Sequence, residues 1–315
     1  MANQNSGNLS KSDILSFVAL LLMGVFVFFG MNFKTLGDKV PSLAVSILLV
    51  VLMTLFIFLA AYAKGQDRYQ DMWKKVEWAM LALYVAALAP CYVYVSKFCE
   101  VQFGRADIVS QVQADVDGID RMFADYKRMC DARCGSYQTA LEALSKDKQG
   151  RVRIAQTLGI GVGDVNSANI RQASESFLNS LRGAEFQALE AEKGQMEAMV
   201  KENFKKWNLM LVPQAAQELG AAKAKYAQTL QDLYSKHQNK FETDVPEFSA
   251  AKYASEVNVA DRFSTISGIT PMGLLVVLVL GGLGFLKYVF AAKRTVLSLK
   301  KGDSSSITSD GGIAF

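Results

Sequence analysis

Residues 41–63 read PSLAVSILLVVLMTLFIFLAAYA and contain no charged side chain. At 1.5 Å per residue, a helix of this length crosses the ~30 Å hydrocarbon core of a bilayer. In lipid only a helix lets such a segment satisfy its own backbone polar groups. Three further apolar stretches occupy residues 14–33, 76–95 and 271–292. The sequence therefore predicts four transmembrane helices in an all-α protein.

Lys287 is the one basic residue inside these stretches. A Lys at the centre of a span opposes insertion by ~2.5–3.5 kcal/mol, whereas each Leu, Val or Phe favours insertion by ~0.3–0.6 kcal/mol. Ten such apolar residues precede Lys287 in the fourth stretch, and Lys287 lies one turn from its end. We expect this side chain to reach the headgroups and to anchor the helix.

The basic residues of the short loops predict the orientation of the chain. Cytoplasmic loops carry an excess of Lys and Arg. The segments that flank the apolar stretches contain Lys11 before the first, Lys34 and Lys39 after it, Lys64, Arg68, Lys74 and Lys75 after the second, and Lys293, Arg294, Lys300 and Lys301 after the fourth. We therefore expect cytoplasmic tails at residues 1–13 and 293–315, the latter disordered. Residues 96–268 would then face the periplasm of a bacterial inner membrane.

The charge balance agrees with this topology. Residues 97–268 contain 22 Lys/Arg and 23 Asp/Glu, and the rest of the chain contains 12 and 7. The net charge of +4 therefore comes from the segments beside the apolar stretches. Basic groups in these places meet anionic lipid first. The expected partner is the lipid bilayer, and nucleic-acid binding is not indicated.

The long insert between the third and fourth stretches has a helical pattern. Apolar residues spaced three and four apart mark the buried face of a helix. One run is Val109, Val112, Val116, Ile119, Phe123, Tyr126, Cys130, Arg133, Tyr137, Ala140 and Leu144, in which Arg133 alone is not apolar. Another is Ala216, Leu219, Lys223, Tyr226, Leu230, Leu233 and His237. These runs predict a helical bundle or coiled-coil-like domain.

Turn signals divide the insert into four predicted helices. We expect a Gly-rich connector at 150–166, a helix start at Pro213 and a separator at 243–247. The residues selected for packing or docking are Phe123, Tyr126, Trp207, Tyr226 and Leu230. Two alternatives remain open: the apolar faces pack within one subunit, or they accept helices of another chain.

Three of the four cysteines, Cys99, Cys130 and Cys134, lie in the insert. Disulfides form outside the cytoplasm, and Cys130 and Cys134 are the natural local pair. On an ideal helix their Cα atoms lie ~6 Å apart, but their side chains diverge. Gly135 suggests a helix end or a kink that relaxes this geometry. The hypothesis is a Cys130–Cys134 disulfide, and the alternative is that both are unpaired packing residues.

Chemistry-bearing motifs are absent from the sequence. There is no HExxH, GxSxG or Walker pattern, and His237 is the only histidine. We therefore expect no enzyme activity, no cofactor and no metal site. Gly281, Gly282 and Gly284 predict that another helix approaches the fourth span closely.

These features favour a non-enzymatic membrane scaffold whose periplasmic bundle docks other membrane or periplasmic proteins, and possible homo-oligomerisation is part of this hypothesis. One alternative is a receptor that relays a periplasmic signal to a cytoplasmic partner. A second alternative is a homo-oligomeric passive pore lined by small polar residues.

Overall fold

The computed structural model describes residues 10–66, 70–236, 241, 247–253, 258–265 and 270–291. Every regular element in these ranges is helical, and none of them contains a strand. The all-α prediction is therefore confirmed for the described part of the chain.

Four helices are long and apolar enough to cross a membrane. They are α1 (Lys11–Lys34), α2 (Lys39–Lys64), α3 (Gln70–Phe103) and the pair α10 (Pro271–Gly284) and α11 (Leu286–Phe290), which forms one candidate span. Each contains the apolar stretch predicted from the sequence, or nearly all of it. The chain is thus a membrane protein by the length and composition of its helices.

The chain forms two compact units. The first contains residues 1–24, 47–91 and 277–315, and the second contains residues 25–46 and 92–276. In the first unit, Tyr84 of α3 donates a hydrogen bond to the Gly281 carbonyl at 2.7 Å. Ser16 of α1 donates to the Leu283 carbonyl at 3.2 Å. These buried hydroxyls join the fourth candidate span to the first and third.

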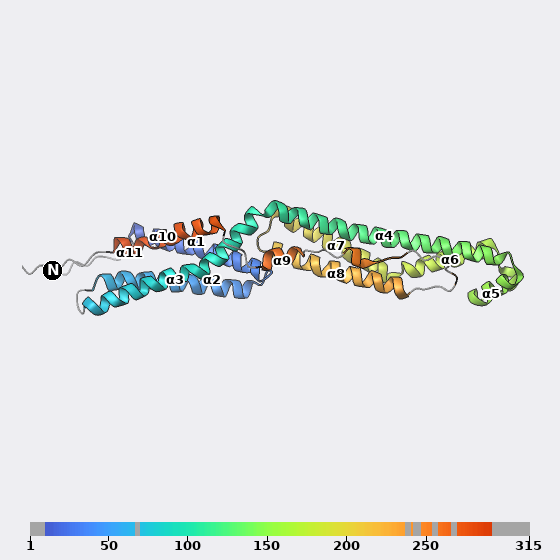
Figure 1. The fold of residues 1–315 in the computed structure, drawn as a ribbon, viewed down its shortest axis with the longest axis horizontal. Coiled ribbons are helices and arrows are strands. Elements are labelled where there is room, and N and C mark those ends of the chain that lie inside the picture. Colours follow the sequence, from blue (N-terminus) through green and yellow to red (C-terminus); the bar gives the residue numbers. More distant parts are fainter. Residues whose placement is uncertain are drawn as a thin grey trace, which may run out of the picture. The chain divides into compact units, whose positions relative to one another are not determined.

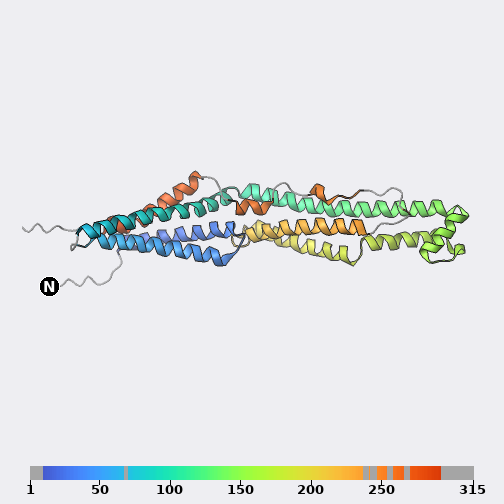
Figure 2. The same cartoon turned by 60° about the horizontal axis from the view of Figure 1, so that its bottom comes forward.

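The helices that lie wholly within the second unit are α4 (Arg105–Ser145), α5 (Lys148–Leu158), α6 (Ser167–Leu181), α7 (Ala184–Lys206), α8 (Val212–Lys236) and α9 (Val259–Ser264). Two short 3-10 turns, η1 (Val162–Asp164) and η2 (Ala250–Tyr253), also lie within it. We call residues 105–264 the insert. Figures 1 and 2 show α4 (green) running beside α7 and α8 (yellow to orange), with α5 and α6 at the far end of α4.

The core of the insert follows the predicted periodicity. Of the first run, the structure buries Val112, Val116, Ile119, Phe123, Tyr126, Cys130, Arg133 and Tyr137, and of the second run Ala216, Leu219, Tyr226, Leu230 and Leu233. All of these except Arg133 and Tyr137 join α7 residues such as Phe186 and Val200 in one cluster. A second cluster, around Leu141 and Ile154, lies where α5 and α6 meet α4.

The division of the insert into helices differs from the prediction in two places. Residues 150–166 contain α5, so this segment is not only a connector. A β-carbon at Gly150 would collide with the Leu144 carbonyl, so glycine here permits close backbone packing. The second predicted helix is broken at Gly183 into α6 and α7.

The sequence suggested a helix end or a kink at Gly135, and the helix end is wrong, because α4 continues through this residue. A glycine inside a helix costs only ~1 kcal/mol relative to alanine. Buried Tyr137 and Leu141 continue the apolar face on its far side, and their packing outweighs this cost. Pro213 lies in the first turn of α8, as predicted. The predicted separator at 243–247 falls outside the described residues except for Glu247.

Candidate functional site

The five residues predicted for packing or docking are all buried within a single chain. The Phe123 ring lies 5.9 Å from that of Phe186 and 5.6 Å from that of Tyr226, centroid to centroid. The Tyr126 hydroxyl donates to the Leu181 carbonyl at 3.0 Å. Leu230 belongs to the same cluster. These side chains have a packing role, and their burial leaves no surface on which a partner can dock.

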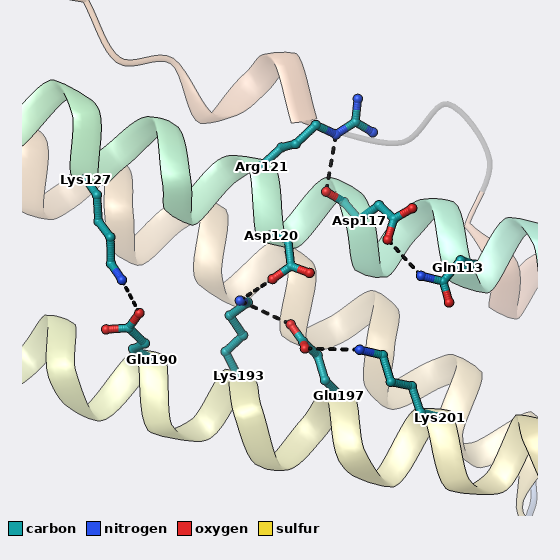
Figure 3. A network of polar contacts seen from close by, with 9 residues as sticks. All are labelled: Gln113, Asp117, Asp120, Arg121, Lys127, Glu190, Lys193, Glu197 and Lys201. Carbon is teal, nitrogen blue, oxygen red and sulfur yellow. Dashed lines mark hydrogen bonds and ion pairs between the residues drawn. The ribbon is translucent and has the colours of Figure 1, made fainter.

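Ion pairs join α4 to α7 along this core (Figure 3). Lys193 of α7 pairs with Asp120 of α4 and, at 3.2 Å, with Glu197. Lys127 of α4 pairs with Glu190 of α7. Burial lowers the pKa of Lys193, but its hydrogen bonds to Asp120 and Glu197 outweigh this effect and raise the pKa overall. Lys193 therefore remains charged where it crosses between the two helices.

Similar pairs join the other helices. Lys223 of α8 pairs with Asp115 of α4 at 2.7 Å, and both side chains are about 15% exposed. Lys225 of α8 pairs with Glu192 of α7, also at 2.7 Å but in solvent. Lys127 and Asp131 are four residues apart on α4, a spacing that allows an ion pair, but Lys127 pairs across to α7. Asp131 instead accepts Arg182, at 2.8 Å.

Arg133, the polar member of the first apolar run, is 1% exposed. Its guanidinium lies 5.6 Å from the ring centroids of Phe177 and Tyr234. It also donates to the Tyr234 carbonyl at 3.4 Å. Delocalised and weakly hydrated, a guanidinium can stack between aromatic faces. Arg133 therefore fits an apolar register as a core residue.

Both cysteines of the predicted disulfide are free thiols in the structure. Cys134 donates to the Ser174 carbonyl at 3.3 Å, and Cys130 is buried. Burial raises the pKa of both thiols. Because α4 does not end at Gly135, the Cys130 and Cys134 side chains keep their helical spacing. The structure therefore corresponds to the alternative in which both cysteines are unpaired packing residues. A disulfide in the oxidised protein stays a prediction.

Trp207 lies apart from the other predicted residues, at the end of α7. Its backbone is left-handed, with a φ of 49°, which is uncommon for a bulky residue. The indole Nε1 donates to Gln102 Oε1 at 3.2 Å. The Arg105 guanidinium lies 5.0 Å from the ring centroid. This geometry anchors the turn between α7 and α8 to the end of α3.

The same turn contacts the turn between α1 and α2. Asn32 is fully buried and donates to the Leu209 carbonyl at 3.4 Å. Leu36 also has a positive φ, of 53°. A β-carbon at Gly37 would meet Gln214 Cβ at 3.0 Å. We call this group of residues the collar: Asn32, Leu36, Gly37, Gln102, Trp207 and Leu209.

The sequence prediction missed the collar except for Trp207. Asn32 was a usable signal, because an amide at the end of an apolar stretch needs polar partners. No sequence pattern indicates a left-handed Leu or Trp. Strained backbone of this kind persists only where the surrounding packing holds it.

The three glycines of the fourth span differ in their surroundings. A β-carbon at Gly284 would lie 2.6 Å from the Tyr84 hydroxyl oxygen, and one at Gly281 would lie 2.9 Å from Leu88 Cδ2. Gly282 has no such neighbour within 4 Å among the described residues. Gly281 and Gly284 thus permit close packing inside the chain, and Gly282 does not take part in it.

Lys287, which we expect to anchor the fourth span, has an ion-pair partner on the first. Its ammonium pairs with Asp13 Oδ1 at 2.5 Å and lies 4.8 Å from the Phe58 ring centroid. The carboxylate neutralises a charge that would otherwise need water. Asp13 and Lys287 therefore join the start of α1 to α11.

Within the described residues, no group of three or more His, Cys, Asp or Glu side chains could hold a metal ion. His237 lies outside them. The chain matches no protein-family model, no curated protein and no solved structure.

Proposed function

We propose that this chain is a non-enzymatic scaffold of a bacterial inner membrane, whose insert docks partner proteins on the periplasmic side within an envelope assembly. Both termini are cytoplasmic in this proposal, since the short basic segments beside the spans favour that side. The supporting observation is the closed core of the insert. Its apolar residues and cross-helix ion pairs are satisfied inside one chain, so the outer faces of its helices are available to partners.

The length of α4 suits a docking element. At 1.5 Å per residue, its 41 residues extend ~60 Å. Paired helices hold such a surface in one conformation, which lowers the entropic cost of binding. Because no catalytic arrangement was predicted from the sequence, the proposal requires the chain only to position other molecules.

A photo-crosslinking scan of the full-length protein in its native membrane tests this function. A photoreactive amino acid at exposed positions such as Gln187, Ala198 and Gln228 should give defined adducts with other envelope proteins. The buried position Leu230 is the matched control and should give none. Scanning every exposed helical face without recovering a protein adduct would refute the scaffold.

The topology requires a separate test. An alkaline phosphatase fused after residue 180 folds with its disulfides only outside the cytoplasm. It should be active, whereas a fusion in the 64–75 loop should be inactive. Activity of the second fusion alone would reverse the proposed orientation.

The collar favours a second candidate, the receptor. A shift of the α7–α8 turn would reach the α1–α2 turn through Asn32 and Leu209, and two strained residues mark this contact. Trp207→Ala should increase hydrogen exchange in the peptide 34–39, while Phe103→Ala, which removes an exposed ring beside the collar, should not. Unchanged exchange in the Trp207 variant would remove the support for relay.

The passive pore remains a prediction, and no contact among the described residues favours it. The hydroxyls of Ser42 and Ser46, two of its small polar residues, donate to the Asp38 and Leu43 carbonyls of their own segment.

A further inference from the structure

The turn between α7 and α8, residues 207–211, has its depth fixed by contacts with the first span. Asn32 of α1 donates to the Leu209 carbonyl at 3.4 Å. Two residues earlier on α1, a β-carbon at Gly30 would collide with the Tyr94 carbonyl of α3, so Gly30 and Tyr94 lie at the same level. Asn32 is only ~3 Å farther along α1, because a helix rises 1.5 Å per residue. The turn therefore reaches to within about one helical turn (~5.4 Å) of the level of Tyr94.

Tyr94 marks the edge of the bilayer on this side of the spans. It is the last residue but one of the apolar stretch 76–95, and Tyr92 precedes it by two residues. Tyrosines are enriched where a span meets the lipid headgroups. Lys34, the last residue of α1, has its ammonium 5.8 Å from the centre of the Tyr94 ring. A lysine at the end of a span reaches toward the headgroups. The α7–α8 turn thus lies at headgroup level.

An apolar side chain of the turn is exposed at this level. Met210 is 37% exposed. Among the described residues of the insert, only Val152 and Val162 are other large apolar side chains with comparable exposure. Both belong to α5 and η1, at the far end of α4 from the spans. Met210 is therefore the exposed apolar residue of the insert that lies beside the spans, and methionine adapts its shape to whatever covers it.

Lipid-facing residues of the second span begin beside the same turn. Val40, in the first turn of α2, is 78% exposed, and Leu43 is 53% exposed. A β-carbon at Gly37 would meet Gln214 Cβ at 3.0 Å, so the start of α8 lies against the turn between α1 and α2. Exposed apolar side chains at this end of a span need lipid to cover them. Lipid therefore begins within a few residues of the contact between the two turns.

Basic side chains precede Met210 in the chain. Lys205 and Lys206 lie in the last turn of α7, and both are exposed. Lys206 pairs with Glu202 at 2.8 Å. The Arg105 guanidinium lies 5.0 Å from the centre of the Trp207 ring. Cations beside an indole and an apolar residue are typical of segments that lie in the headgroup layer, where the cations meet lipid phosphate.

We propose that the α7–α8 turn enters the headgroup layer of the bilayer, with Met210 against the upper acyl chains and Lys205 facing headgroup phosphate. Phospholipid is the occupant of this surface, because the contact of Leu209 with Asn32 holds the turn at the level of Tyr94. The insert then has a lipid anchor of its own, besides the spans that flank it. This anchor goes beyond the proposed function, and it requires only that the four apolar helices cross a membrane, in either orientation.

Depth-dependent fluorescence quenching tests the anchor. Full-length protein with Met210→Cys carries a bimane fluorophore at that position and is reconstituted into vesicles of phosphatidylethanolamine and phosphatidylglycerol. Cys134→Ser is included, because the other cysteines, all within the described residues, are buried. A doxyl spin label near the top of the acyl chains should quench the fluorophore about twofold or more, and a label near the chain ends should quench it less.

A matched position on α7 provides the control. Gln187→Cys lies ~30 Å along the helix from the turn, is also exposed, and should show no quenching. In the Met210→Cys protein, Lys205→Glu should reduce the quenching by about twofold, because a carboxylate is repelled by headgroup phosphate. Lys201→Glu, on the same face but one turn farther away, should have a smaller effect. Equal fluorescence at positions 210 and 187 in spin-labelled lipid would overturn the proposal.

Photo-crosslinking in the native membrane gives a second measurement that does not depend on the cysteine variants. A photoreactive amino acid in place of Met210 should form an adduct with the mass of a phospholipid. A protein adduct in its place would show that the turn binds a partner protein, which would overturn the lipid anchor and leave the scaffold in place. A lipid adduct at 210 together with no protein adduct at the other exposed positions would leave the anchor and remove the scaffold.

Discussion

The candidate spans and the insert are both helical, but they turn opposite faces outward. On the spans, large apolar side chains such as Val40 (78% exposed) and Leu278 (61%) point away from the protein. In the insert, Phe123 and Tyr226 are at most 2% exposed, and the outer faces carry ion pairs. The spans need lipid to cover them, whereas the insert covers its own core. The side chains that each region exposes thus indicate whether lipid or water surrounds it.

The largest predicted effect concerns the core of the insert. Phe123→Ala should lower the free energy of unfolding by ~3–5 kcal/mol, because a buried ring and its two aromatic contacts are lost. Guanidinium unfolding in detergent can follow Trp207 fluorescence after Trp73 and Trp78 are replaced by Phe. Val152→Ala, at an exposed site, should change stability by less than ~0.5 kcal/mol. Equal effects of the two variants would mean that the insert has no packed core.

In the spans, a pair of neighbouring glycines should give effects of opposite sign. Gly284→Ala places a methyl group 2.6 Å from the Tyr84 hydroxyl and 2.8 Å from Leu20 Cδ2. Overpacking of this kind costs ~1–3 kcal/mol. Gly282→Ala meets no described neighbour and should gain up to ~1 kcal/mol from helix propensity. The melting temperatures of both variants, measured as full-length protein in one detergent, test this difference in sign. A fall in both melting temperatures would count against the helix packing at Gly284.

The contribution of each cross-helix ion pair to stability should depend on how exposed the pair is. Lys223→Met removes the ion pair with Asp115, in which both side chains are about 15% exposed, and should cost ~1.5–3 kcal/mol. Lys127→Met breaks a pair that is about 40% exposed and should cost less than ~1 kcal/mol. The same guanidinium titration measures both. A larger loss for Lys127 would show that burial does not set the strength of these pairs.

The smallest effect is a pH dependence at Tyr226. Burial, together with the nearby charges of Glu192 and Glu197, raises its pKa to about 12 from 10.0. Below pH 10 the hydroxyl is protonated in both the folded and the unfolded state. Above pH 10 the unfolded state loses this proton first, so stability falls as the pH rises toward 12. The melting temperature of the wild type should therefore fall more steeply over this range than that of Tyr226→Phe, and parallel curves would contradict the assigned pKa.

The sequence predicted the spans well, because hydropathy acts over about 20 residues and tolerates a single exception such as Lys287. Periodicity likewise selected Phe123, Tyr126, Tyr226 and Leu230 for packing or docking, and the structure buries all four. It did not detect the break at Gly183, since Leu181 and Ala184 are spaced as in one continuous helix. Gly150 looked like a turn residue, although its role is close packing against the end of α4.

Local sequence patterns could not predict the collar or the ion pairs between helices. Asn32, Gln102 and Leu209 meet only because three distant turns of the chain lie together, and no spacing records this. Asp131 lies four residues from Lys127 on the same helix, a spacing that favours an ion pair. Lys127 nevertheless pairs with Glu190 of α7. Contacts between helices decided these cases, and they depend on the packed fold.

The Asp13–Lys287 pair has a consequence for the connectivity of the chain. Ser16 also accepts a hydrogen bond from the Lys287 backbone amide at 2.9 Å, so the first and last described helices touch where they begin and end. Segments that meet in this way can be joined in a circular permutant. A permutant that links residue 291 to residue 10 and opens the chain at the exposed turn 159–163 retains both contacts. Such a rearranged chain would present two new ends at the tip of the insert, ready to carry a fluorescent label or a tether.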